Sequence, residues 1–311
     1  MCLIAAAVDV PGPWLLVLAA NRDEFHDRHT APAAWWRGTS PHIFGGRDLQ
    51  AGGTWLGLGR RGHDGGLRVG ALTNLRPGLM PPPATPAAPD GVPPSRGRLV
   101  ADYLSAKAGP SAFLASLDPP PAVFAGFNLL AIQAAGGRDG VEAWYLNNLP
   151  GSRPRRLASG VHVVSNATLD VDWPKTRLLR DAMTRALAAT TGAVVDADAD
   201  GPGEAAPIAQ PDAEADAGPE RLEALLFEAL ADRSTAPAAA LPRTGLDPER
   251  ERLLSAPFIV DDHYGTRCST VLGVRRDGFV FFTEQRFGPA GRTLGAVRER
   301  FTLPWVSESR H

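Results

Sequence analysis

The chain contains few cysteines and few lysines, and it has no long run of apolar residues. Its 311 residues include two cysteines, Cys2 and Cys268, so a framework of several disulfides is excluded. The sequence has no uncharged apolar stretch of about 18 residues, which excludes an ordinary membrane-spanning helix. The first apolar run is interrupted by Asp9 and Pro11 before it reaches the length of a signal peptide, so we expect a cytoplasmic protein without membrane insertion.

A strong charge of one sign is also missing. The formal net charge is −2 at pH 7 and the basic residues are scattered, which argues against nucleic acid as a partner and favours a small-molecule ligand. Residues 191–220 are acidic, contain no basic residue and offer few large apolar groups. Such a segment cannot offset its ordering entropy by burial, so we expect a disordered acidic insertion within a single domain spanning 1–311. The sequence does not indicate an oligomeric state.

The arrangement of apolar segments predicts a mixture of strands and helices. Two short apolar segments, 2–8 and 14–20, flank a turn-rich stretch and predict a buried hairpin whose first strand begins at Cys2. Further strands are predicted at 67–73, 126–133, 141–146, 161–164, 269–274 and 279–285, and helices at 97–107, 111–117, 174–188 and 220–231. Ser111 is the expected N-cap of the second helix. The glycine-dense stretch 45–66 is expected to form tight turns.

Cys2 is the candidate nucleophile. Removal of Met1 would leave the α-amino group on the same residue as the thiol, and a neutral amine could accept the thiol proton directly or through one water. The alternative is a cysteine that only begins a buried strand, where free cysteine behaves as a small apolar residue.

Polar residues follow the apolar part of the predicted hairpin. Asn21, Arg22, Asp23 and Glu24 are expected beside Cys2, where the arginine would favour a thiolate and one carboxylate would orient the amine or the substrate. A solvated turn is the alternative interpretation of this run. Asn74 and Asn166 each follow a predicted strand, where an amide could donate to a developing oxyanion or only form a turn.

Eight motifs occur along the chain in one order. They are MCLI, AANRDEFHDR, GGRDLQAGGTWLG, ALTNLR, SRG, GFNLL, VSNATLD followed by WPK, and YGTRCSTVL. This order resembles the NRDE family, also called the transport and Golgi organization protein 2 family, over residues 2–286. The resemblance implies an α/β fold of the α+β kind, a four-layer αββα sandwich of the N-terminal-nucleophile (Ntn) hydrolase type with mainly antiparallel sheets.

The same resemblance implies roles for individual residues. The family is more distantly similar to penicillin V acylases and bile-salt hydrolases, whose parallel motifs fall here at Cys2, Asn74, Asn166 and Arg267. By that likeness Cys2 is the nucleophile, the backbone N–H of Asn74 and the side-chain amide of Asn166 form the oxyanion hole, and Arg267 supports Cys2. The acylases separate their arginine and aspartate by two positions, whereas Arg22 and Asp23 are adjacent here and Glu24 follows. Which of the two carboxylates supports Cys2 therefore stays open.

Two classes of function fit these observations. The first is hydrolysis or transfer of the acyl group of a non-peptide amide or a thioester, with no metal and no cofactor. The second is a non-catalytic carrier, because the family is also linked to haem trafficking and to acyl-coenzyme A or lipid handling. Under this alternative Cys2, His26, His263 or Cys268 could bind haem iron. A scaffolding role for the acidic insertion fits the resemblance least.

We predict that the mature chain begins with Cys2, because a small second residue permits removal of Met1 by methionine aminopeptidase. The intact mass of the purified protein measures this directly. Retention of Met1 on most molecules would contradict the mechanism in which the α-amine of Cys2 is the base.

Overall fold

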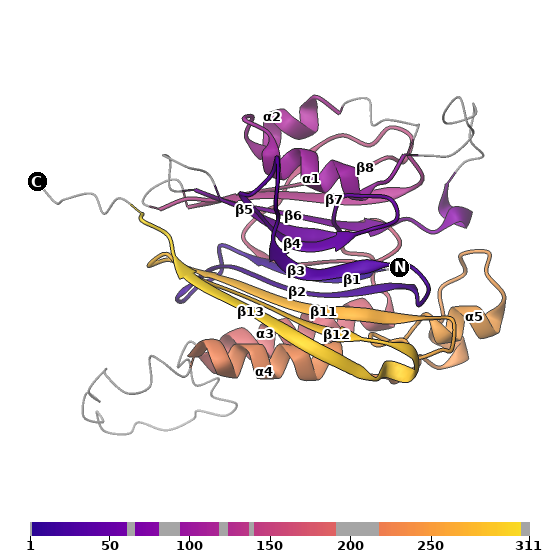
Figure 1. The fold of residues 1–311 in the computed structure, drawn as a ribbon. Helices are drawn as coiled ribbons and strands as arrows, with labels where there is room; N and C mark the ends of the chain where they lie inside the picture. The colour runs from indigo at the N-terminus through magenta and orange to yellow at the C-terminus, as the bar shows by residue number, and fades with distance from the viewer. Residues whose placement is uncertain are drawn as a thin grey trace, which may run out of the picture.

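Two antiparallel sheets are stacked on each other in the computed structural model, which describes residues 2–60, 66–80, 94–117, 124–136, 140–190 and 218–305 (Figure 1). The first sheet has the order β10-β1-β2-β11-β12-β13, with bounds Gly160–Val164, Cys2–Val8, Trp14–Phe25, Tyr264–Arg275, Phe279–Phe287 and Thr293–Thr302. The second has the order β3-β4-β5-β6-β7-β8-β9, with bounds Thr30–Trp35, Ile43–Asp48, Leu56–Arg60, Leu67–Asn74, Phe127–Ala134, Val141–Asn147 and Arg155–Arg156.

Helices cover the outer face of each sheet. α1 and α2 pack on the second sheet and α3 and α4 on the first, while α5 lies at one end; their bounds are Gly97–Ser105, Pro110–Ala115, Pro174–Thr190, Gly218–Leu230 and Pro248–Leu253 (Figure 1). Short 3-10 turns occupy Pro77–Leu79, Ala238–Ala240 and Pro289–Gly291. The layers therefore follow the order helix, sheet, sheet, helix, which confirms the predicted α+β sandwich.

The β1–β2 hairpin is buried on both faces. Along β1, Ile4, Ala6 and Val8 pack between the two sheets. The alternate residues Leu3 and Ala5 contact the layer formed by α3 and α4. Strands covered on both sides need apolar residues at every position, which explains the continuous apolar sequence and confirms the predicted hairpin.

β2 is longer than its sequence predicted. It continues through Phe25, so the polar run that begins at Asn21 lies within the strand and not after it. The strand continues because β11 pairs with it as far as Tyr264, which hydrogen-bonds the backbone that the apolar pattern alone left unassigned.

Four further differences concern single elements. The prediction that Ser111 caps its helix is wrong, because α2 begins at Pro110 after the N-cap Gly109, and proline suits the first helical position. The glycine-dense stretch contains β4 and β5 as well as turns. The C-terminal β13 was not predicted. Of the predicted acidic insertion, 191–217 lie outside the described residues, whereas 218–220 belong to α4.

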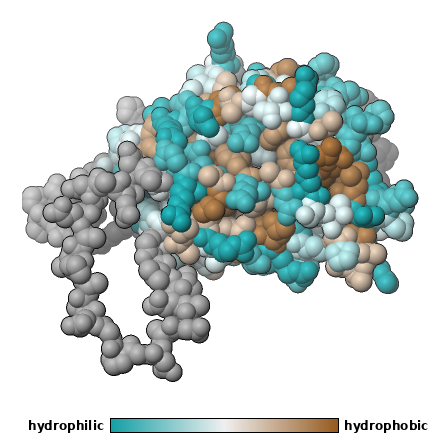
Figure 2. Space-filling view, turned by 90° about the horizontal axis from the view of Figure 1, so that it is seen from below, coloured by the Kyte–Doolittle hydropathy of each residue, from teal (hydrophilic) through white to brown (hydrophobic). Residues whose placement is uncertain are grey.

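The outer face formed by α3 and α4 carries both hydrophobic and hydrophilic residues. Figure 2 shows hydrophobic patches on this face separated by hydrophilic ones. The apolar residues of α4 that contact the first sheet are buried at Leu222, Leu226 and Leu230, a spacing that directs one stripe of the helix inward.

Replacing Leu18 by Ala should lower the free energy of unfolding by about 2–5 kcal/mol, because its side chain is 0% exposed between the sheets and its loss leaves a cavity. Leu49→Ala is the matched control, since Leu49 is 59% exposed. Urea denaturation measures both, and equal losses would contradict the placement of the core.

Candidate functional site

Cys2 lies in register with two neighbours in the first sheet. It pairs with Arg22 of β2, which in turn pairs with Cys268 of β11. The Cys2 residue is 8% exposed, and burial raises the pKa of its thiol, while the nearby Arg22 and a hydrogen bond from the backbone N–H of Asp23 oppose that rise. Both cysteines are free. The Cys2 thiol is therefore protonated at neutral pH unless a base accepts its proton.

A cavity of about 500 Å³ opens in front of Cys2. Residues of the first sheet, of the second sheet with its loops, and of the start of α1 line it: Cys2, Arg22, Asp23, Glu24, Arg28, Asp48, Gln50, Ala51, Thr54, Trp55, Leu72, Asn74, Pro94, Ser95, Arg96, Gly97 and Ala125. The cavity thus brings together five of the eight predicted site residues, namely Cys2, Arg22, Asp23, Glu24 and Asn74. Its volume suits a small molecule.

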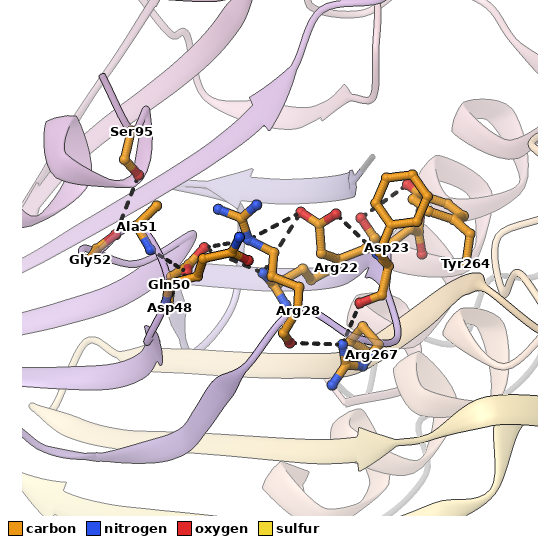
Figure 3. Close-up of polar contacts among 12 residues, drawn as sticks. Arg22, Asp23, Arg28, Asp48, Gln50, Ala51, Gly52, Ser95, Tyr264 and Arg267 are labelled. Carbon is orange, nitrogen blue, oxygen red and sulfur yellow. Dashed lines mark hydrogen bonds and ion pairs between the residues drawn. The ribbon is translucent and has the colours of Figure 1, made fainter. Parts of the chain in front are cut away.

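Four charged side chains form a cluster along one wall of this cavity (Figure 3). The Nη2 atom of Arg22 lies 3.9 Å from Oε2 of Glu24 and 3.8 Å from Oδ2 of Asp48. The Nε atom of Arg28 lies 2.7 Å from the same Asp48 oxygen and 3.7 Å from the same Glu24 oxygen. The Arg22 guanidinium also lies over the Trp55 ring, 4.2 Å from its centroid. Two positive and two negative charges therefore compensate one another.

The two candidate carboxylates have different surroundings. Asp23 is buried, its Oδ1 accepts a 2.7 Å hydrogen bond from Oγ1 of Thr266, and its backbone carbonyl accepts one from the hydroxyl of Tyr264. Burial raises the pKa of Asp23. Glu24 is partly exposed, lies beside the arginines of the cluster and accepts the backbone N–H of Phe25. Glu24 thus belongs to the arginine cluster, whereas the Asp23 carboxylate is hydrogen-bonded to Thr266 of β11.

The two asparagines are in contact. Asn166 is fully buried, and its Nδ2 donates a 2.9 Å hydrogen bond to the backbone carbonyl of Asn74. The neighbouring Ser165 donates from Oγ to the carbonyl of Cys2 at 3.0 Å. These bonds tie the loop after β10 both to the first residue of β1 and to the end of β6. Asn74 lines the cavity, and Asn166 reaches it through its hydrogen bond to Asn74.

Asn21 and Arg267 have other partners. The Asn21 amide donates to the carbonyls of Leu230 and Pro257, so it joins β2 to the end of α4 and to the loop beyond. Arg267 lies at a bulge between β2 and β11, and its Nη1 donates to the carbonyls of Phe25 and Arg28 (Figure 3). It lines a smaller cavity of about 60 Å³ beside Cys268 and not the cavity of Cys2. Its support of Cys2 stays a prediction.

Three residues near the site were missed at the level of sequence. Asp48 completes the charge cluster, and Arg96 lines the cavity from the start of α1. Lys175 of α3 is 3% exposed, and its Nζ donates a 2.9 Å hydrogen bond to the carbonyl of Leu254. Burial lowers the pKa of Lys175 to about 8, and the charge of nearby Asp23 opposes this shift. The sequence offered two indications of these roles: lysine is rare in the chain, and Arg96 and Lys175 lie within the SRG and WPK motifs.

Two features are absent from the part of the chain that the structure describes, a cluster of metal-binding side chains and a membrane-spanning helix. There, no three His, Cys, Asp or Glu side chains gather as they would around a metal ion. Nor does any helix of that part combine the length and the apolar character that crossing a bilayer requires.

The fold and the cavity define an α+β sandwich protein with a cysteine-centred pocket. The chain belongs to the family described as Transport and Golgi organisation 2, whose family model matches residues 1–289. It is 31% identical over 300 residues to the Transport and Golgi organization protein 2 homolog of Bos taurus, and 29% identical over 299 residues to that of Homo sapiens, covering 92% of each chain in both cases. It is 42% identical over 112 residues to Transport and Golgi organization protein 2 of Drosophila melanogaster, covering 34% of this chain and 35% of that one.

Lys175 should make stability depend on pH. Its folded-state pKa of about 8 lies below the ordinary value of 10.5, so the unfolded chain binds more protons between these two pH values. This group therefore disfavours folding most below pH 8, and its penalty declines as the pH rises toward 10.5. We predict that the free energy of unfolding of the wild type rises relative to that of Lys175→Met across this window.

Urea denaturation at several pH values measures that difference. Lys107→Met is the matched control, because Lys107 is the other lysine of the chain and is exposed. Parallel stability curves for the wild type and Lys175→Met would show that Lys175 titrates normally in the folded protein.

Proposed function

We propose that this chain is an N-terminal-cysteine amidohydrolase or acyltransferase that acts on an amide or thioester of a small molecule. The observation that carries the proposal is the position of Cys2, which lines a cavity of about 500 Å³ that Asn74 also lines. A nucleophile and a candidate oxyanion donor thus face the same space. Both cysteines are free, which fits the reducing cytosol where we expect the chain to act.

The proposed reaction begins with proton transfer from the thiol to the α-amine, which lies on Cys2 once Met1 is removed. The sulfur then forms a bond to the carbonyl carbon, and the carbonyl electron pair moves to the oxygen of a tetrahedral intermediate. Collapse of this intermediate breaks the C–N or C–S bond, and the ammonium returns the proton to the leaving amine or thiol. Water or another acceptor then takes the acyl group from Cys2 by the same steps.

The oxyanion would be stabilised at the end of β6. The backbone N–H of Asn74 is the proposed first donor, because Asn74 lines the cavity with Cys2. The side-chain amide of Asn166 is the proposed second donor, and one of its two N–H groups already donates to the Asn74 carbonyl. This contact would also hold the Asn74 backbone in place, which is the kind of preorganisation that oxyanion stabilisation requires.

Asp23 is the proposed partner of the α-ammonium group. Glu24 lies within 4 Å of two arginines, whereas the Asp23 carboxylate accepts a hydrogen bond from Thr266 and the Asp23 backbone N–H donates to the sulfur of Cys2. Lys175 lies close enough to stabilise the charge of Asp23 in a buried position. For the choice that the sequence left open we therefore propose Asp23, with Glu24 as part of the charge cluster.

The carrier function is the second candidate. The relatives' names refer to transport and Golgi organisation, which favours handling of a ligand over its conversion. Acyl-coenzyme A or another lipid-derived ligand would occupy the same cavity. For haem as the cargo, Cys2 is the one side chain among the described cavity-lining residues that commonly binds haem iron, since His26, His263 and Cys268 lie outside that lining.

Replacing Cys2 by Ser should abolish acylation of the protein while leaving its stability nearly unchanged, because the volume is kept and the thiolate chemistry is lost. A panel of p-nitrophenyl thioesters and anilides, followed by intact mass, measures acylation and release of the leaving group. Cys268→Ser is the matched control. Burial raises the pKa of Cys268 well above its ordinary value, so it should react little and its replacement should change the rate little.

Equal acylation of the wild type and Cys2→Ser would exclude Cys2 as the nucleophile. Binding of haem or acyl-coenzyme A without turnover of any member of the panel would favour the carrier function instead.

A further inference from the structure

Arg96 differs from the other two arginines that line the cavity. Arg22 and Arg28 each lie within 4 Å of both carboxylates of the charge cluster. Arg96 has no carboxylate at that distance among the described residues, and its recorded hydrogen bond runs from Nη1 to the carbonyl of Gly126 at 3.0 Å. A guanidinium carries five N–H donors. Most donors of Arg96 are therefore uncommitted to acceptors within the part of the chain that the structure describes.

The charge of Arg96 is costly where it lies. Burial lowers the pKa of Arg96, and the nearby groups that counter this shift are Cys2 and Glu24, the latter already shared by two arginines. A guanidinium nevertheless stays protonated in proteins. A partly buried cation without its own counterion is destabilising unless something else supplies the negative charge.

The backbone that carries Arg96 is held firmly against the second sheet. It is the N-cap residue of α1, and the following Gly97 accepts at its carbonyl a 3.1 Å hydrogen bond from the N–H of Thr54. Gly53 adopts a positive φ of 77°, and a Cβ there would lie 2.3 Å from the carbonyl carbon of Gly97. Ser95 adds a bond from Oγ to the carbonyl of Gly52 (Figure 3). The arginine is thus presented from a close backbone contact and not from a free loop.

The positive charge of Arg96 is not compensated by the other charged residues around the cavity. The two positive and two negative charges of the cluster compensate one another, and Asp23 lies close to the buried Lys175. Arg96 and Cys2 line the same cavity from different layers of the fold, so one small molecule could contact both.

We infer that Arg96 is the subsite for a carboxylate or phosphate group, so that the compound that reaches Cys2 is an anion. Both anions present two acceptor oxygens at a spacing that allows a guanidinium to donate two parallel hydrogen bonds. The inference deepens the proposed function and rests on it only for the statement that the bound compound reacts at Cys2.

The test compares two probes that differ in charge at one end. Glutaramate carries a carboxylate and an amide, whereas glutaramide carries an amide at both ends; a phosphonate analogue of glutaramate distinguishes the two anions. Calorimetric titration of Cys2→Ser, which cannot turn over the probes, should show the anions binding about tenfold to a hundredfold more tightly than glutaramide. In the double variant with Arg96→Gln this preference should vanish, while Arg96→Lys should keep part of it.

Arg98→Gln is the matched control, because Arg98 lies on the same helix, is 74% exposed and pairs with Asp102. It should keep the full preference, and thermal melting should show all variants folded. An equal preference before and after Arg96→Gln, or none in Cys2→Ser, overturns the inference.

Acylation separates this inference from the proposed function. Matched glutaryl and pentanoyl thioesters are given to the chain with Cys2 intact. An Arg96-dependent binding preference without acylation of Cys2 by either thioester supports the anion subsite and contradicts the catalytic proposal. Acylation at equal rates by both thioesters in the wild type and in Arg96→Gln contradicts the subsite and supports the catalytic proposal.

Discussion

Burial of the β1–β2 hairpin on both faces is the constraint on which the rest of the structure depends. On a central strand between a second sheet and a helix layer, a polar side chain without a partner costs free energy. Where β2 changes from apolar to polar residues, each side chain is therefore matched by the layer that it faces. Arg22 lies near the Asp48 carboxylate and over the Trp55 ring, both on the side of the second sheet. Asn21 donates hydrogen bonds to the backbone carbonyls of Leu230 and Pro257.

The alternation of a β-strand divides the polar run into two pairs. Arg22 and Glu24 share the face of Cys2, Ile4 and the inter-sheet core, while Asn21 and Asp23 share the face of the helix layer. The sequence Asn-Arg-Asp-Glu is thus not a single cluster. Arg22 and Glu24 contribute to the charge cluster of the cavity wall. Asn21 joins the strand to the end of α4, and Asp23 lines the cavity and lies close to Lys175.

The sequence predicted those elements whose signal is local. Continuous apolar strands and helices with regular spacing were predicted, and two residues that the family resemblance singles out, Cys2 and Asn74, line one cavity. β4 and β5 were missed because glycines replace apolar residues where a neighbour packs closely: α1 at Gly57 and Gly59, and the Trp55 ring at Gly46. Arg96 and Lys175 acquire their meaning only from partners far along the chain. The hydrophobic periodicity of the sequence cannot predict that Lys175 of α3 is buried close to Asp23 of β2.

The unpredicted β13 has a consequence for solubility. It lies at the end of the first sheet and covers β12, whose sequence FVFFT combines β-branched and aromatic residues. Two of its exposed positions, Arg298 and Arg300, carry positive charge. Without this strand, β12 would be an edge strand with unpaired backbone groups and apolar side chains. Such an edge favours strand pairing between molecules. β13 therefore protects the edge of β12 from intermolecular pairing, although the match to the family model ends at residue 289, before β13 begins.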